Sequence, residues 1–77
     1  MPPDATDHVI DLRRLESFLI HPTIARQAAL TSVDDSFWIV VDHDPIELYD
    51  FLIDLGLTVQ TFIVSASEFR VFLGKIS

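Results

Sequence analysis

The sequence predicts a two-layer α/β sandwich in which two helices cover one face of a four-stranded sheet. A β-branched and aromatic run at residues 37–41 has the composition of a central strand. Amphipathic segments at residues 22–29 and 45–55 lie on either side of that run and favour helices. Two more apolar segments, 57–64 and 68–76, are separated by three small residues, which is typical of a hairpin.

The first half of the chain is predicted to hold one short strand and one short helix. We expect residues 1–7 to be a flexible lead, residues 9–12 to form a strand and residues 15–21 to form a loop with at most one helical turn. Pro22 suits the first position of a helix, where its missing N–H costs nothing. The apolar face of this helix would be formed by Ile24, Ala25, Ala28 and Ala29.

The second helix is predicted from the local signal Asp42-His43-Asp44-Pro45. Asp44 is expected to cap the helix, with Pro45 at its first position and Glu47 completing an Asp-x-x-Glu variant of the capping box. Gly56 is expected to end the helix in the left-handed conformation. The core-facing side would be Leu48, Tyr49, Leu52 and Leu55, and the solvent side Glu47, Asp50 and Asp54.

The element order is therefore β-α-β-α-β-β in a single domain of residues 8–77, preceded by the lead. Right-handed crossovers place both helices on one face of the sheet, which leaves the other face open. Alternation along the strands turns one set of side chains toward this open face: Trp38, Val40, Thr58, Gln60, Phe62, Val64, Arg70 and Phe72.

Three aromatic side chains of that set, Trp38, Phe62 and Phe72, predict an exposed patch. A contiguous apolar surface is typical of a contact site, so we expect this face to bind another protein or a second copy. The alternative is that the aromatics are scattered singly or that residues 1–7 fold over them.

Composition excludes several classes of partner. The formal net charge is −7, from five Lys and Arg against twelve Asp and Glu, so no basic stripe is available for nucleic acid or an anionic membrane surface. The longest apolar run, residues 37–41, is too short to span a bilayer. The first residues lack the pattern of a secretory signal, and we therefore expect a cytoplasmic protein.

Without cysteine, neither a disulfide nor a zinc ribbon can stabilise so small a core.

Several motifs resemble those of a bacterial domain-of-unknown-function family, number 2249, which is itself similar to the TusA and SirA sulfur carriers. The motifs are Ile10-Asp11-Leu12-Arg13, His21-Pro22-x-Ile24, Val41-Asp42-His43-Asp44-Pro45 with Leu48, and Glu68-Phe69-Arg70-Val71. The resemblance implies a sheet ordered 1-2-4-3 in which strand 4 is antiparallel to its neighbours. It also implies an association with hemerythrin-like modules or with nitrogen-oxide metabolism.

Sulfur carriers hold a Cys-Pro pair at the start of the first helix, where the helix dipole favours the thiolate. The matching region here is Ser17-Phe18-Leu19-Ile20-His21-Pro22, which has no thiol. A persulfide cannot form on this chain, so we expect that it is not a sulfur carrier.

A candidate ligand edge follows from the rule that parallel α/β units bind ligands beyond the carboxyl ends of their strands. The residues expected there are Arg13, Arg14, His21, Asp42, His43 and Asp44. His8 falls at the opposite edge. The dipole of the second helix is expected to keep His43 neutral at pH 7.

Two readings of this edge stay open. His21 and His43 could hold a transition metal, with Asp42 as a third ligand, or a haem. Alternatively no cofactor is held: Asp44 caps the helix, Asp42 pairs with Arg13 or Arg14, and the histidines bond to backbone.

Catalysis is not predicted, because no serine lies in a nucleophile elbow and the only glycines are Gly56 and Gly74. The leading hypothesis is a non-catalytic interaction or accessory module in redox or nitrogen-oxide metabolism. The alternative is a small metal- or haem-linked protein that uses His21 and His43.

Overall fold

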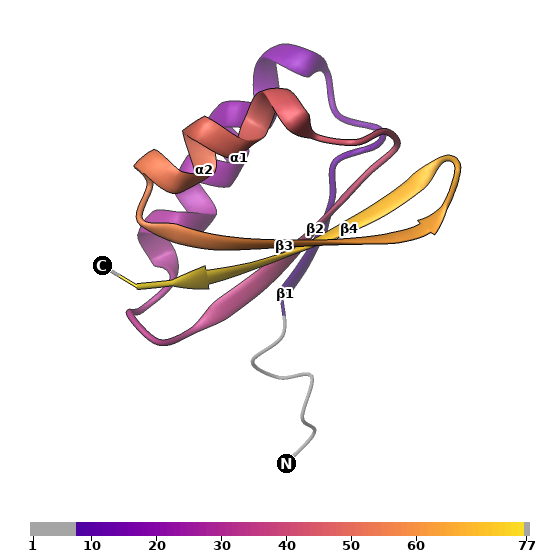
Figure 1. Cartoon of the computed structure of the whole chain (residues 1–77). Coiled ribbons are helices and arrows are strands. Elements are labelled where there is room, and N and C mark those ends of the chain that lie inside the picture. The colour runs from indigo at the N-terminus through magenta and orange to yellow at the C-terminus, as the bar shows by residue number, and fades with distance from the viewer. Residues whose placement is uncertain (1–7, 77) are drawn as a thin grey trace.

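The elements follow one another in the predicted order in a computed structural model, which describes residues 8–76 (Figure 1). The predicted lead, residues 1–7, lies outside the described residues. The elements are β1 (His8–Asp11), α1 (Ser17–Leu30), β2 (Ser36–Val41), the 3-10 turn η2 (Ile46–Leu48), α2 (Tyr49–Asp54), β3 (Leu57–Ser65) and β4 (Glu68–Lys75).

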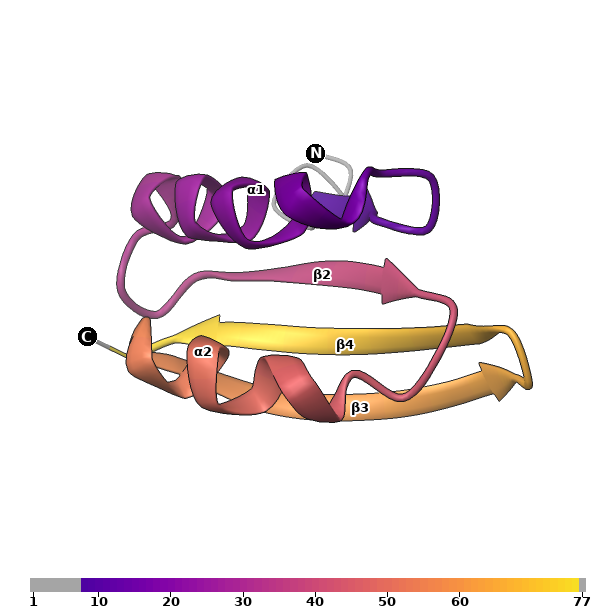
Figure 2. The same ribbon diagram turned by 90° about the horizontal axis from the view of Figure 1, so that it is seen from above.

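The sheet has the order β1-β2-β4-β3, with β1 parallel to β2 and β4 antiparallel to both of its neighbours. Both helices lie on the same side of this sheet (Figures 1 and 2). Helix α2 runs above β3, and α1 lies toward the β1 side (Figure 2). The predicted fold class is thereby confirmed, and β3 and β1 form the two edges.

The core lies between the helices and the two central strands. In β2, Phe37 and Ile39 are opposite Leu73 and Val71 of β4, and none of the four is exposed. Their side chains share the helix-facing side because the residues alternate in both strands. The helices close the core with Ile24 and Ala28 from α1 and Leu48 and Leu52 from the η2–α2 segment.

Helix α1 begins at Ser17, five residues before the predicted start, so the expected loop at residues 15–21 is wrong. Pro22 is not the first helical residue but lies inside the helix. A proline there cannot donate an N–H to the carbonyl of Phe18, four residues earlier. The Phe18 side chain is 73% exposed, so water can reach this first turn and the lost hydrogen bond is tolerated.

The apolar face of α1 is narrower than predicted. Ile24 and Ala28 are buried and Ala25 is partly buried, but Ala29 is exposed. The carboxyl end of the helix is held by the sheet, because Lys75 Nζ of β4 donates a 2.6 Å hydrogen bond to the Ala28 carbonyl. A cation at this end also opposes the negative pole of the helix dipole.

The predicted capping box at the second helix is wrong. The segment starts with the 3-10 turn, and no side chain caps it. The Asp44 carboxylate instead accepts a 3.2 Å hydrogen bond from the Tyr49 hydroxyl, and the Glu47 carboxylate contacts His43. The N–H of Ile46 bonds to a backbone oxygen, so the first turn closes without a side-chain acceptor. Gly56 has φ 80°, as the predicted left-handed stop requires.

Replacing Phe37 by alanine tests the core. We expect Phe37→Ala to lower the free energy of unfolding by about 3–5 kcal/mol, because it empties a fully buried site. Phe18→Ala is the matched control, since the same atoms are removed from an exposed position and should change stability by less than about 0.5 kcal/mol. Urea denaturation measures both, and equal midpoints for the two variants would contradict this core.

Candidate functional site

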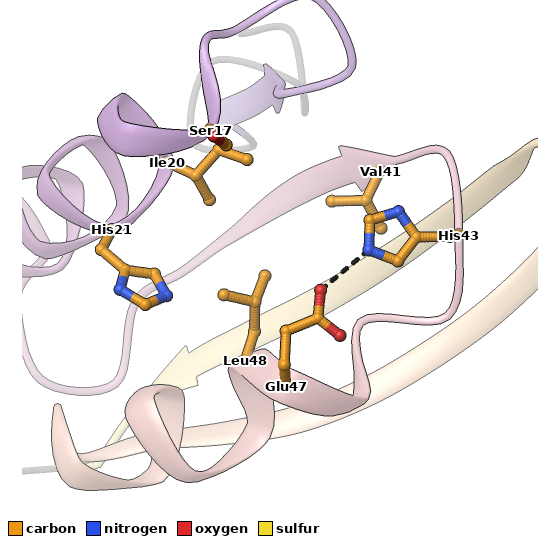
Figure 3. Close-up of a pocket in the computed structure, with 7 residues that line it drawn as sticks. All are labelled: Ser17, Ile20, His21, Val41, His43, Glu47 and Leu48. Carbon is orange, nitrogen blue, oxygen red and sulfur yellow. Dashed lines mark hydrogen bonds and ion pairs between the residues drawn. The ribbon is translucent and has the colours of Figure 1, made fainter.

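The carboxyl end of β2 faces the first turns of α1 across a cavity of about 200 Å³ (Figure 3). His21 comes from α1 and His43 from the loop after β2, so the structure brings together the two histidines that the sequence placed on one edge. The histidine cavity is lined by Ser17, Ile20, His21, Val41, His43, Glu47 and Leu48.

His43 lies between two carboxylates. Its Nδ1 is 2.7 Å from Asp42 Oδ1 and its Nε2 is 2.9 Å from Glu47 Oε1 (Figure 3 draws the second contact). Both ring nitrogens therefore face acceptors, an arrangement that the doubly protonated imidazolium satisfies. The hydrogen bond to Glu47, followed by that to Asp42, raises the pKa of His43 above its ordinary value.

The prediction of a neutral His43 assumed a lowered pKa, and the direction of that shift is wrong. The expectation relied on the partial positive charge of a helix amino terminus, but two full negative charges at hydrogen-bond distance act in the opposite sense. Glu47 is absent from the predicted edge because its spacing from Asp44 predicts a capping-box role. Its spacing from His43, four residues along the chain, is the sequence signal that could have identified the pair.

The same contacts lower the pKa values of Asp42 and Glu47, in each case chiefly through the hydrogen bond to His43. The histidine contribution to stability is complete below its ordinary pKa and is lost as pH rises through its raised folded pKa. The carboxylate contribution is present above their ordinary pKa values and is lost as pH falls through their lowered ones. His43, Asp42 and Glu47, which we call the charge triad, are thus all charged in mildly acidic solution, and their side chains are exposed enough for salt to screen the contacts.

His21 has a different environment. Its ring stacks on Phe51 of α2, with centroids 4.3 Å apart and planes inclined by 19°. The interpretation without a cofactor predicts a hydrogen bond from His21 to backbone, whereas the contact that the structure shows for its ring is this stacking on Phe51. Within residues 8–76, no group of three or more His, Asp or Glu side chains has the arrangement of a metal site. Metal ligation by His21 and His43 stays a prediction, and it requires His43 to exchange one carboxylate contact for the ion.

The pairing of Asp42 with Arg13 or Arg14 is wrong, because Asp42 instead contacts His43 and Arg13 is bound by Asp11. The Arg13 Nε and Nη2 atoms donate bonds of 2.9 and 2.7 Å to the two Asp11 oxygens, a bidentate geometry that lowers the pKa of Asp11 to about 2. Arg13 also lies 3.6 Å from Glu68, which accepts a 2.9 Å bond from Arg70. These four side chains form an ion-pair network across the open face of the sheet.

The predicted ligand edge is therefore divided. His21 and His43 line the histidine cavity, and Asp42 contacts His43. Arg13 belongs to the ion-pair network, Asp44 is bonded to Tyr49, and the exposed Arg14 does not line the cavity.

The open face carries the predicted aromatic residues. The Trp38 ring lies 5.0 Å from Phe72 in an edge-on orientation and 5.6 Å from Phe62, distances typical of interacting aromatic pairs. We call these three side chains the aromatic cluster. Phe62 is 47% exposed, and Trp38 and Phe72 are half-buried.

Val40 differs from the expectation for this face. Its side chain points outward as predicted, but it is only 3% exposed. Val40 lies in register between Asp11 and Arg70, so the side chains of the ion-pair network flank it. The stems of long arginines commonly cover apolar surface in this way.

Comparisons with protein-family models, with curated proteins and with solved structures found no match for this chain. Among the described residues, no helix has both the length and the apolar character needed to cross a membrane.

Removing the Glu47 charge tests the charge triad. We expect Glu47→Gln to lower the pKa of His43 toward its ordinary value, because the amide keeps a hydrogen-bonding shape but carries no charge. Asp50→Asn is the matched control, since this acidic residue of α2 makes none of the His43 hydrogen bonds. Histidine resonances followed by NMR during a pH titration give the result. An unchanged His43 midpoint in Glu47→Gln would contradict the geometry.

Proposed function

We propose that this chain is a non-catalytic protein-interaction module whose open sheet face binds a second copy of the chain. The observation that carries the proposal is the aromatic cluster. It alternates with the buried, helix-facing residues of β2 and β4 and therefore lies on the side of the sheet opposite both helices. Aromatic side chains supply large contact area at low entropic cost, and they are enriched at the centres of protein interfaces.

The charges of the open face support a second copy as the occupant. Asp11, Arg13, Glu68 and Arg70 balance one another, two of each sign, although the whole chain has a net charge of −7. Two copies of this acidic protein repel one another on most approaches. Their open faces can approach without that repulsion, and the balanced network would lie beside the aromatic contact.

The small size of the domain also supports association. A chain of this length buries only about 60% of the surface that it exposes when unfolded, so its own core provides a narrow stability margin. Covering the aromatic cluster with a second copy would extend burial beyond what one chain can reach alone.

The family resemblance supports a proposal about the metabolic setting of the protein, but it does not identify a chemical reaction. The sheet order and the strand directions agree with what the resemblance to family 2249 implies. On that basis we propose a cytoplasmic accessory role in redox or nitrogen-oxide metabolism. Without cysteine the chain would act there by contact and not by sulfur transfer.

Sedimentation velocity over a range of protein concentrations tests the proposal. We expect the wild-type chain to associate into dimers as concentration rises and Phe62→Arg to remain monomeric, because two added cations would meet across the interface. Ile63→Arg is the matched control. It lies next to Phe62 in β3, points to the other side of the sheet and is 73% exposed, so it should dimerise like the wild type.

Circular dichroism of each variant confirms that the fold is retained. A wild-type chain that remains monomeric throughout, or a Phe62→Arg variant that associates normally, would overturn this proposal.

A further inference from the structure

A second surface, separate from the open face, lies where α2 passes over the edge strand β3 (Figure 2). A groove of about 410 Å³ opens there between Tyr49 and Ile53 of α2 and Val59 and Thr61 of β3. Ile53 is 61% exposed, so the groove is open to solvent, and β3, which lines it, is an edge strand. The Tyr49 hydroxyl lies 2.8 Å from Thr61 Oγ1, which fixes one wall to the other.

The backbone of β3 has hydrogen-bonding groups directed away from the sheet along this groove. The Ile76 N–H donates a 3.0 Å bond to the Gly56 carbonyl, just before β3 begins. Hydrogen-bonded pairs recur at every second residue of an antiparallel ladder. The even-numbered residues of β3 are therefore those whose backbone bonds to β4. In an antiparallel pair, the residues between them point their N–H and C=O groups the other way. Those residues are Leu57, Val59, Thr61 and Ile63.

The groove and the outward backbone groups therefore belong to the same residues. Val59 and Thr61 line the groove with their side chains and present their N–H and C=O groups at the edge. A strand placed against β3 would form ladder hydrogen bonds with this edge, and its alternate side chains would enter the groove. Strand β3 has no proline and no charged residue, the features that usually block such pairing.

The negative charge around the groove indicates which kind of partner segment can bind there. From Asp42 to Ser67, both included, the chain has five acidic residues and no Lys or Arg. Asp50 and Asp54 are exposed on α2, the helix that forms one wall of the groove. A partner segment with Lys or Arg is attracted to this region, and an acidic segment is repelled.

The same charges disfavour a second copy at this edge. Antiparallel pairing of two β3 strands would keep the helices of both copies on one side of a continuous sheet. The two α2 helices, each with exposed Asp50 and Asp54, would then lie on the same side of that sheet, at a cost in repulsion.

We propose that the β3 edge and its groove bind an extended segment of a different protein by strand addition. The segment has alternate apolar side chains, which occupy the groove, and flanking Lys or Arg side chains, which lie near the carboxylates of α2. This site is independent of the open face, and a chain that cannot self-associate would retain it.

Selection from a displayed library of random peptides of about seven residues, a strand length, tests the proposal. The full-length chain is the bait. We expect enriched peptides to alternate apolar residues with polar ones and to be rich in Lys and Arg. A synthetic copy of an enriched peptide should bind about tenfold more weakly to Ile53→Arg, because the new side chain fills and charges the groove.

Phe62→Arg serves as the control that separates the two surfaces. It lies on β3 but faces the opposite side of the sheet, so it should bind the peptide like the wild type even though it no longer self-associates. Ile53→Arg should show the reverse behaviour. This pair of variants therefore distinguishes a failure of the groove from a failure of the proposed self-association.

Amide hydrogen exchange provides a readout specific to strand addition. The peptide should protect the N–H groups of Val59, Thr61 and Ile63, which point outward, and leave those of their β4-bonded neighbours unchanged. The proposal is overturned if no basic alternating peptide is enriched, or if enriched peptides bind Ile53→Arg normally. Protection of the outward amides in the concentrated chain alone would assign this edge to a second copy and would also overturn it.

Discussion

The antiparallel pairing of β2 with β4 determines which side of every other element is buried. Phe37 opposite Leu73 and Ile39 opposite Val71 point toward the helices, and the residues between them point away. A shift of one residue would exchange the two sets and place Trp38 in the core. The full burial of the first set is the reason that this register is fixed. The aromatic cluster on the open face is therefore a geometric consequence of the same pairing that builds the core.

The parts of the structure set by strand alternation and chain order could be predicted from the sequence. The run 37–41, the hairpin and Gly56 lead directly to the order of elements, and right-handed crossovers then place both helices on one face. The aromatic cluster follows from the same alternation, since Trp38 and Phe72 are paired residues. Local periodicity is sufficient here because burial acts on every second residue along each strand.

The parts set by competition between polar groups could not be predicted in this way. Asp44 and Glu47 have the spacing of a capping box, but Tyr49 binds the first and His43 the second. His43 is adjacent to Asp42 and four residues from Glu47, so it can reach both carboxylates at once. Which acceptor a side chain chooses depends on the local path of the backbone, and the 3-10 turn that sets this path has no clear sequence signature.

The uneven distribution of charge relates the two proposed surfaces. The open face is balanced, whereas the region that includes α2 and β3 has acidic residues and no Lys or Arg. An edge strand without proline or charge is a template for pairing with other strands, including those of a second copy, which makes it a risk for aggregation. Here the neighbouring acidic helix supplies the repulsion that β3 lacks. Because this repulsion acts between like copies but attracts basic segments, it can prevent self-pairing and still leave the edge available to a different protein.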